Sequence, residues 1–276
     1  MLCEKIDDQL ETLTAFAISA NRQCLAIACT HRNDKSAYIY FYDTIQAKRL
    51  KRMPKIIHEG SPTDNEGRHF TSIAFSPEAK HIAALTNLQD GNVRVYEWRK
   101  DRVIAASSWV TEIKRENKEY SNVELTKITI DPANKDQVVM SGRNHARVWR
   151  SQGGVLRPLP KIPGLEQTNN YTDHAWIENT WTIFGTDTGE LFFILESKQC
   201  VIKSNAFGAI TESVSCIYPY YRGLVIGGNN GQISLWKKKD NAEEVAKKEF
   251  VGDRDVHLKL AFRFERNLSK FLGKRE

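Results

Sequence analysis

The 276-residue sequence lacks most of the features that mark membrane-spanning, secreted or disulfide-stabilised proteins. No run of roughly 18 apolar residues occurs, so no segment is expected to span a membrane. The first residues do not show the basic stretch followed by an apolar stretch that is typical of a secretory signal. The five cysteines are odd in number and show no paired spacing, which indicates buried strand thiols in a reducing compartment.

Motifs for catalysis and for cofactor binding are also missing. The sequence contains no phosphate-cradling glycine loop, no Gly-x-Ser-x-Gly turn and no His-Glu-x-x-His helix motif. Cys24 and Cys29 lie at opposite ends of one short predicted strand without a histidine pair nearby, so their spacing does not define a metal site. His58 and His69 bound a polar segment that fixes no ligand geometry. We therefore predict no catalytic residue, no cofactor and no metal.

What the sequence does contain is a repeat. Five alternating apolar runs each end in a bulky residue, and these residues are 42 to 54 positions apart: Tyr42, Tyr96, Trp149, Ile194 and Trp236. A repeat of this length that is built from short strands is typical of a β-propeller. Since propellers act mostly as rigid binding platforms, the repeat favours a binding function over a catalytic one.

The second repeat shows the internal plan most clearly. It predicts four strands, at 70–75, 81–86, 93–96 and 102–106. Pro77 ends the first strand because it fixes one backbone angle and removes a hydrogen-bond donor. Asp90 and Gly91 form a tight turn of the kind that joins two strands of a hairpin. Four strands in about fifty residues make one propeller blade.

The amino-acid sequences of these strands and turns resemble those of the WD-repeat proteins. The segment Ala74-Phe75-Ser76-Pro77, the Asp-Gly turns and the Trp or Tyr at strand ends carry this resemblance. From about Leu13 to Lys239, the order of these segments is similar to that in the first propeller of the axonemal cilia- and flagella-associated WD-repeat proteins. The resemblance is to the members of this family that have two propellers and a coiled coil and that are linked to inner dynein arms. The most specific segments are Asn170–Trp176 and Gly185–Gly189.

The resemblance implies a non-enzymatic scaffold of the ciliary axoneme that helps to dock or regulate inner dynein arms on doublet microtubules. The implied partners are dynein or regulatory subunits, with tubulin as a further candidate, and neither nucleic acid nor membrane is expected. A general cytoplasmic WD-repeat adaptor that binds peptides of a multiprotein complex is the alternative. An enzyme is the third class, and the absence of converging polar residues argues against it.

The pair Asp173 and His174 is the nearest approach to an acid–base pair, but adjacent residues on a strand point to opposite faces. In WD repeats a histidine near the start of a blade forms a hydrogen bond within the fold, and we expect this role for His174.

We expect an all-β, incomplete WD-repeat propeller over residues 1–264, followed by a basic tail over residues 265–276. Asp255–Phe262 is interpreted as the first strand of a sixth blade, so the chain is expected to be a truncated paralogue or part of a larger protein. Open blades expose sheet edges, which are a liability unless they are covered. Another chain or a missing segment is therefore expected to cover them.

Basic residues are the candidates for partner binding, because a positive surface attracts acidic partners. The net charge is +6, and several basic clusters follow the third strand of a repeat. The candidate residues are Lys237, Lys238, Lys239, Arg99, Lys100 and Arg102. The resemblance suggests the acidic outer face of a microtubule as their partner, and solvated loops are the alternative interpretation.

Three further segments interrupt the repeat. His58–His69 and Thr111–Asn122 are polar enough and long enough to be predicted as loops. The proline-rich segment Leu156–Gly164 is predicted to be an extended connector.

Overall fold

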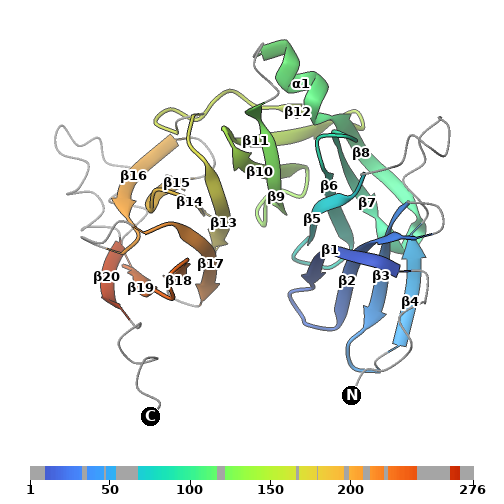
Figure 1. The fold of residues 1–276 in the computed structure, drawn as a ribbon, viewed down its shortest axis with the longest axis horizontal. Coiled ribbons are helices and arrows are strands. Elements are labelled where there is room, and N and C mark those ends of the chain that lie inside the picture. The colour runs from blue at the N-terminus through green and yellow to red at the C-terminus, as the bar shows by residue number, and fades with distance from the viewer. Residues whose placement is uncertain are drawn as a thin grey trace. The chain divides into compact units, whose positions relative to one another are not determined.

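The structure, a computed structural model, describes most of the chain between Leu10 and Asn267 (Figure 1). The described residues are 10–32, 36–46, 48–53, 68–116, 122–165, 168–178, 180–195, 199–207, 212–220, 223–240 and 262–267. Within these residues the strands follow one another in five sets of four, and in each set the strands that are consecutive in sequence are neighbours in a sheet. This arrangement confirms the all-β architecture that the repeat predicts.

The five sets follow chain order, and each is called a sheet below, although the second and third are joined through their last strands into one eight-stranded sheet. The first contains β1 (Leu10–Ile18), β2 (Cys24–His31), β3 (Ala37–Asp43) and β4 (Lys48–Met53). The second contains β5 (Phe70–Phe75), β6 (His81–Thr86), β7 (Asn92–Glu97) and β8 (Arg102–Ser108). The third contains β9 (Glu124–Ile130), β10 (Gln137–Arg143), β11 (His145–Gln152) and β12 (Val155–Pro158). The fourth contains β13 (Tyr171–Ile177), β14 (Trp181–Thr186), β15 (Glu190–Leu195) and β16 (Gln199–Asn205), and the fifth contains β17 (Val214–Tyr220), β18 (Gly223–Gly228), β19 (Ile233–Lys238) and β20 (Phe262–Asn267).

The predicted repeat corresponds to the third strand of each sheet, since all five alternating apolar runs lie in β3, β7, β11, β15 or β19. The burial of β7 alternates along the strand, as its alternating apolar run predicts, and every residue of β6 is buried. In the turn between them Gly91 has a φ of +64°, which favours glycine, and a Cβ there would lie 2.5 Å from Cγ2 of Val110. The tight turn therefore depends on this glycine for both backbone conformation and space.

Two segments predicted to be irregular contain regular structure instead. The segment Thr111–Asn122 begins inside α1 (Trp109–Glu116), where Trp109 and Ile113 are four residues apart and share one buried face. The proline-rich segment begins inside β12, and Pro158 is tolerated because it ends that strand. The predicted loop His58–His69 lies outside the described residues except for its last two.

The C-terminal predictions fall mostly on residues that the structure does not describe. The strand expected at Asp255–Phe262 lies outside the described residues except for Phe262, which begins β20. This strand pairs antiparallel with β19 and is the outer strand of the fifth sheet. The domain boundary expected after residue 264 falls within β20, and residues 268–276 of the basic tail lie outside the described part.

The chain divides into two compact units. The N-terminal unit comprises Met1–Met140 and Val148–Leu159, and the C-terminal unit comprises Ser141–Arg147 and Pro160–Glu276. The first two sheets and most of the third belong to the N-terminal unit, whereas the fourth and fifth sheets belong to the C-terminal unit. In the part of the chain that is described, no helix has the length and apolar character needed to cross a membrane.

Each unit is held together by apolar side chains between neighbouring sheets. In the N-terminal unit, the core between the first two sheets includes Phe41 and Trp98, whose rings stack at 4.4 Å, and the next core includes Trp149. In the C-terminal unit, the core between the fourth and fifth sheets includes Trp181 and Trp236. Trp149 and Trp236, which end two of the repeated apolar runs, are both buried in these cores.

Candidate functional site

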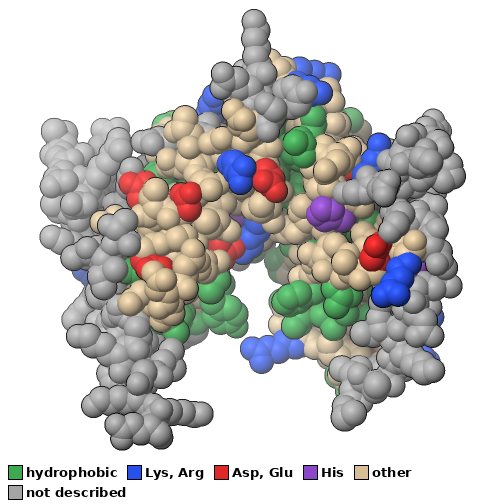
Figure 2. Space-filling view, in the orientation of Figure 1, with side chains coloured by type: hydrophobic (Ala, Val, Ile, Leu, Met, Phe, Trp, Pro, Cys, Tyr) green, Lys and Arg blue, Asp and Glu red, His purple; other side chains and the backbone are tan. Residues whose placement is uncertain are grey.

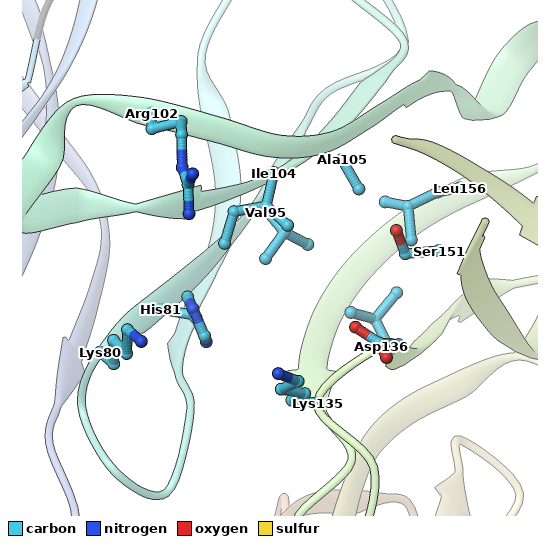
Figure 3. Close-up of a pocket in the computed structure, with 11 residues that line it drawn as sticks. Lys80, His81, Val95, Arg102, Ile104, Ala105, Lys135, Asp136, Ser151 and Leu156 are labelled. Carbon is cyan, nitrogen blue, oxygen red and sulfur yellow. The ribbon is translucent and has the colours of Figure 1, made fainter. Parts of the chain in front are cut away.

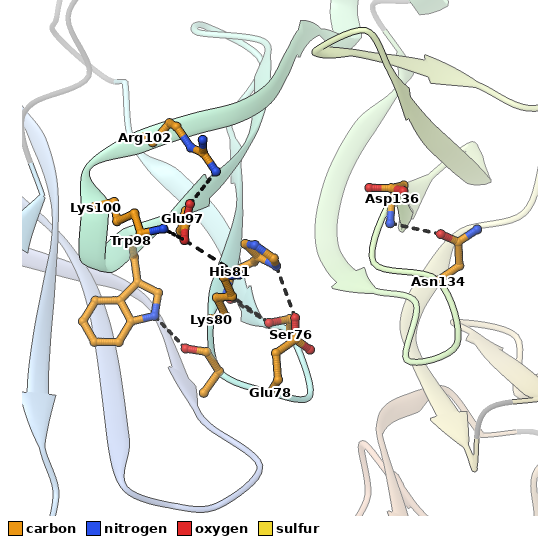
Figure 4. Close-up of polar contacts among 11 residues, drawn as sticks. Ser76, Glu78, Lys80, His81, Glu97, Trp98, Lys100, Arg102, Asn134 and Asp136 are labelled. Atoms are coloured by element: carbon orange, nitrogen blue, oxygen red, sulfur yellow. Dashed lines mark hydrogen bonds and ion pairs between the residues drawn. The ribbon is translucent and has the colours of Figure 1, made fainter.

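A buried carboxylate organises the basic residues at one end of the second sheet. Glu97, the last residue of β7, is the direct cross-strand neighbour of Arg102 in β8, and its side chain is only 2% exposed. It accepts hydrogen bonds from Arg102 at 2.6 Å and from Lys100 Nζ at 2.8 Å, and Lys80 Nζ lies 3.9 Å away (Figure 4). The hydrogen bond from Lys100 lowers the pKa of Glu97 below its ordinary value of 4.5, with smaller Coulombic contributions from its three cationic neighbours. One ionised carboxylate thus holds three cations.

The turn between β7 and β8 positions the remaining basic residue. It consists of one 3-10 turn, η2 (Trp98–Lys100), followed by Asp101 in the left-handed region with a φ of +52°. Trp98 is buried and donates its indole N–H to the carbonyl of Ala79 at 2.8 Å, which fixes this turn to the one between β5 and β6. The guanidinium of Arg99 lies 4.3 Å from the centre of the Trp98 ring, within the range of a cation–π contact. The three predicted binding residues of this turn therefore each have a partner within the fold.

Beside this turn, a cleft of about 160 Å³ separates the second sheet from the third (Figure 3). The outer strands β8 and β12 pair in parallel at one position, Ala106 with Val155, and the Ala106 amide donates to the carbonyl of Gly154 at 3.0 Å. The cleft opens next to this pairing, within the N-terminal unit. Its apolar lining consists of Val95, Ile104, Ala105, Val138 and Leu156.

The polar lining of the cleft is mainly cationic. Lys80 and Arg102 come from the second sheet, and Lys135 and Asp136 come from the turn between β9 and β10 on the third (Figure 3). Among these, the sequence singles out only Arg102. Lys80 and Lys135 were missed because each is a single lysine, 55 residues from the other. One feature of the sequence could have brought them together. Both lysines lie in the turn between the first and second strands of a repeat, and such turns lie at the same end of their sheets.

The cleft also contains residue types that occur in nucleophilic sites, namely Ser151, His81 and Asp136. Nδ1 of His81 lies 3.2 Å from Oε1 of Glu78, so this nitrogen is engaged by its own turn. His81 lies on the wall formed by the second sheet, and Ser151 lies on the opposite wall (Figure 3). The backbone amide of Ser151 donates to the carbonyl of Asp136 at 2.7 Å, which ties the strand to the turn. These contacts join each residue to its own wall and support a binding cleft.

The second predicted basic cluster lies on the C-terminal unit at the end of β19. Lys237, Lys238 and Lys239 are all half-buried. Lys238 forms an ion pair with Glu178, which is 52% exposed and lies in the turn between β13 and β14. Lys237 pairs in register with Arg263 of β20. Because successive strand residues point to opposite faces, Lys237 and Lys238 do not share a surface.

The pair Asp173 and His174 joins β13 to two other strands of the C-terminal unit. The Asp173 carboxylate accepts a hydrogen bond from the backbone amide of Ile217 at 2.6 Å, and the His174 ring bonds the Ser141 hydroxyl at 2.7 Å. His174 is fully buried. The two side chains act on opposite sides of the strand, which confirms the structural role that the sequence predicts for His174.

One face of β1 carries large apolar side chains that are exposed. Leu13 is 62% exposed, Phe16 is 74% exposed and Ile18 is 55% exposed, whereas Ala15 and Ala17 pack toward the second sheet. Figure 2 shows a hydrophobic patch over β1 and β2.

The cysteines agree in part with the expectation of buried strand thiols. Cys24 and Cys29 are free and buried in β2, whereas Cys216 in β17 is free and exposed. Cys3 and the side chain of Cys200 lie outside the described part. Across the described residues, no three His, Cys, Asp or Glu side chains are grouped so that they could hold a metal ion.

Solved structures define the class of protein. The β-propeller domain of Cps50 (Swd1) from Myceliophteria thermophila matches with a TM-score of 0.62 and 12% identity, covering 92% of this chain and 71% of that one. U3-55K matches with a TM-score of 0.58 and 13% identity, covering 84% of this chain and 64% of that one. The chain thus has an all-β WD-repeat propeller fold, as its repeat and its five sets of four strands indicate.

Sequence similarity points to particular relatives within this class. Cilia- and flagella-associated protein 57 of Mus musculus is 29% identical over 192 residues, which cover 70% of this chain. Cilia- and flagella-associated protein 57 A of Tetrahymena thermophila is 21% identical over 186 residues, which cover 63% of this chain. The chain spans 14% of the length of each of these relatives. No protein-family model matches the sequence.

Proposed function

We propose that this chain is a non-enzymatic scaffold of the ciliary axoneme that helps to dock or regulate inner dynein arms on doublet microtubules. The observation that carries the proposal is the 29% identity with the mouse cilia- and flagella-associated protein over 192 residues. Four-stranded sheets with large apolar cores are rigid, and their turns are free to contact other proteins. Such a platform suits protein–protein contacts.

The polar contacts of the cleft support a binding role. Glu97 is committed to three cations, and His81 is engaged by Glu78. A catalytic base must instead reach a nucleophile or a substrate proton within hydrogen-bond distance. Both groups here hold turns in place.

The proposed partners are proteins of the axoneme, namely dynein or regulatory subunits, with tubulin as a further candidate; nucleic acid and membrane are not proposed partners. The basic residues around Glu97 and at Lys237, Lys238 and Lys239 provide positive charge for an acidic partner. These contacts are expected to weaken with salt, because exposed charges are screened.

The exposed face of β1 is proposed to be covered by a further four-stranded sheet, from another chain or another segment. Exposed apolar patches on soluble proteins commonly mark interaction sites, and Leu13, Phe16 and Ile18 form such a patch. The second sheet already packs against the opposite side of β1 in this way. The matched solved propeller is also longer, since this chain covers 71% of it.

Fractionation of isolated cilia tests the proposed location. Cilia are demembranated with detergent, the axonemes are extracted with increasing salt, and an antibody against this chain is used to follow it. We expect the chain to stay with the axonemes through the detergent step and to be released only at high salt. Recovery in the detergent-soluble fraction of membrane and matrix would contradict the axonemal proposal.

A general cytoplasmic adaptor is the second candidate function. The observation that favours it is the cleft between the second and third sheets, whose lining can hold a peptide in any compartment. Expression of the tagged chain in cells with and without cilia separates the two functions. An adaptor forms the same complexes in both cell types, whereas an axonemal scaffold forms its complexes only in ciliated cells.

A further inference from the structure

We propose that the cleft between the second and third sheets binds an extended acidic peptide, with one aliphatic side chain of the peptide inside the cleft and its carboxylates on the rim. The proposal goes beyond the scaffold function and does not depend on it, because the cleft has the same lining inside or outside a cilium.

The size of the cleft favours a side chain over a whole small molecule. Its volume is about 160 Å³, whereas sites for small molecules and cofactors commonly have roughly 300–1,000 Å³. A single aliphatic side chain fits this space, and the peptide that carries it can lie along the opening.

The inner lining is apolar and firmly held. Val95, Ala105, Val138 and Leu156 are buried and belong to the core between the second and third sheets. Ile104 is half-buried at the same wall. An aliphatic side chain that enters the cleft removes its own apolar surface from water, at roughly 25 cal/mol per Å². The walls need little rearrangement because they are already packed.

The rim is complementary to negative charge. Lys80, Arg102 and Lys135 line the cleft with one carboxylate, Asp136. The Glu97 carboxylate forms ion pairs with Lys80, Lys100 and Arg102. Its single negative charge is therefore divided among three cations and leaves the rim with a net positive charge. It also holds the Arg102 guanidinium in place before a ligand arrives, which reduces the entropic cost of binding. Acidic side chains on either side of the aliphatic anchor match this rim.

An extended backbone fits the strands that border the cleft. β8 pairs with β12 only at Ala106 and Val155, and Arg102, Ile104 and Ala105 of the same strand line the cleft next to this pairing. A peptide that lies along this part of β8 can pair with a strand edge, as in β-strand addition. The lining includes no Phe, Tyr or Trp side chain on which a nucleobase would stack. A peptide therefore fits the cleft better than a single-stranded nucleic acid.

The direct test measures binding of a fluorescein-labelled peptide, Gly-Glu-Asp-Leu-Glu-Asp-Gly, to the full chain by fluorescence anisotropy at low salt. Two control peptides separate the contribution of the aliphatic side chain from that of the carboxylates. One has Gly in place of Leu, and the other has Gln and Asn in place of Glu and Asp. We expect each control to bind at least tenfold more weakly than the first peptide.

Two variants locate the site. Lys135 is exposed, so Lys135→Glu reverses a rim charge without touching the core, and Ser151→Trp places an indole in the half-buried wall. We expect either variant to weaken the peptide at least tenfold. Lys48→Glu is the matched control, since Lys48 is exposed in β4 of the first sheet and the change alters the net charge equally. We expect the affinity of this variant to stay within twofold of that of the unmodified chain. Thermal unfolding of each protein checks that it is folded.

Three results would overturn the proposal. The first is no saturable binding of the peptide at millimolar concentration. The second is equal weakening by Lys135→Glu and Lys48→Glu, which would indicate general charge attraction. The third is equally strong competition by a single-stranded oligonucleotide with the same number of charges, which would indicate a polyanion surface. None of these results bears on whether the chain resides in the axoneme, so this proposal and the ciliary function fail separately.

Discussion

The two basic clusters of this chain look alike in sequence and differ in structure. Arg99, Lys100 and Arg102 lie around a carboxylate that is 2% exposed, beside a cleft, and Lys80 joins them from another turn. The run 237–239 lies along the end of β19, and Lys238 forms an ion pair with a glutamate that is 52% exposed. The first cluster is a fixed arrangement of charge, whereas the second alternates between two sides of a strand.

This difference shows what a charge pattern in a sequence leaves open. Three basic residues in a row indicate positive charge, but a strand points them alternately to its two faces. A turn that follows a buried acidic residue gathers its cations on one side, because ionised Glu97 must be compensated. The position of the counter-charge therefore decides whether a basic cluster forms a surface.

The largest expected effect comes from removing the tryptophan beneath each cluster. Trp98→Ala and Trp236→Ala should each lower the free energy of unfolding by roughly 3–5 kcal/mol, because both rings are buried and a cavity remains. Both indoles also donate hydrogen bonds, to the carbonyls of Ala79 and Ala206 respectively. Chemical denaturation followed by circular dichroism measures the change. An unchanged unfolding midpoint for Trp236→Ala would contradict the packing of the fifth sheet.

One buried histidine of the C-terminal unit should make the stability of the folded chain depend on pH. Burial, with Arg147 and Lys161 nearby, lowers the pKa of His145 in the C-terminal unit from 6.5 to about 3. The folded protein therefore keeps this ring neutral at a pH where the unfolded chain already binds a proton. Stability should be constant with respect to this group above pH 6.5 and should fall as the pH decreases from 6.5 toward 3, with a slope of at most about 1.4 kcal/mol per pH unit.

His145→Gln is the variant that checks this assignment. It removes the titrating group, so the unfolding free energy of the chain should depend less steeply on pH between 6.5 and about 5, where carboxyl groups contribute little. Urea denaturation at a series of pH values measures the slope. The same slope in the variant and in the unmodified chain would show that another group is responsible.

A smaller effect compares the counter-charges of the two clusters directly. Glu97→Gln should lower the melting temperature clearly, because it leaves three cations around a neutral and buried amide. Glu178→Gln should change stability by less than about 1 kcal/mol, because its ion pair is exposed on the glutamate side. Equal melting temperatures for the two variants would remove the distinction between the clusters.

Acid should reveal the same contrast. The pKa of Glu97 lies below 4.5, so its stabilising contribution is fully present above pH 4.5 and is lost as the pH falls through its lower value in the folded protein. The difference in melting temperature between the unmodified chain and Glu97→Gln should therefore shrink below pH 4.5. Differential scanning calorimetry at pH 7 and at lower pH values measures it, and a difference that stays constant would contradict the ionised state of Glu97.

The fold could be predicted from the sequence because its signals are local. Each third strand alternates within a few residues, and the turn before each third strand contains a glycine or an asparagine, so five repeats could be aligned without any long-range information. The role of His174 followed from strand alternation and from the resemblance to WD repeats. In contrast, α1 is not predicted, because Trp109 lies outside every predicted strand and Ile113 falls in a segment that is predicted to be a polar loop.

The cleft could not be predicted because it depends on contacts between repeats. Lys80 and Lys135 approach one another only when the second and third sheets pack, and each is unremarkable in its own turn. Likewise, nothing in the local sequence shows that Glu97 is buried while Glu178 is exposed, since this depends on the neighbouring turns. The location of the cleft therefore depends on how two neighbouring blades pack, and it cannot be read from the sequence of a single repeat.

Rebinding to stripped axonemes would test most directly whether the organised cluster is the working surface. Demembranated axonemes are extracted with high salt, and the purified chain is added back as the unmodified protein, as Lys135→Glu or as Lys237→Glu. We predict saturable rebinding of the unmodified chain, with at least a tenfold loss of affinity for Lys135→Glu and a smaller loss for Lys237→Glu. Rebinding that is unaffected by Lys135→Glu and weakened by Lys237→Glu would contradict the account, because it would place the partner on the end of β19.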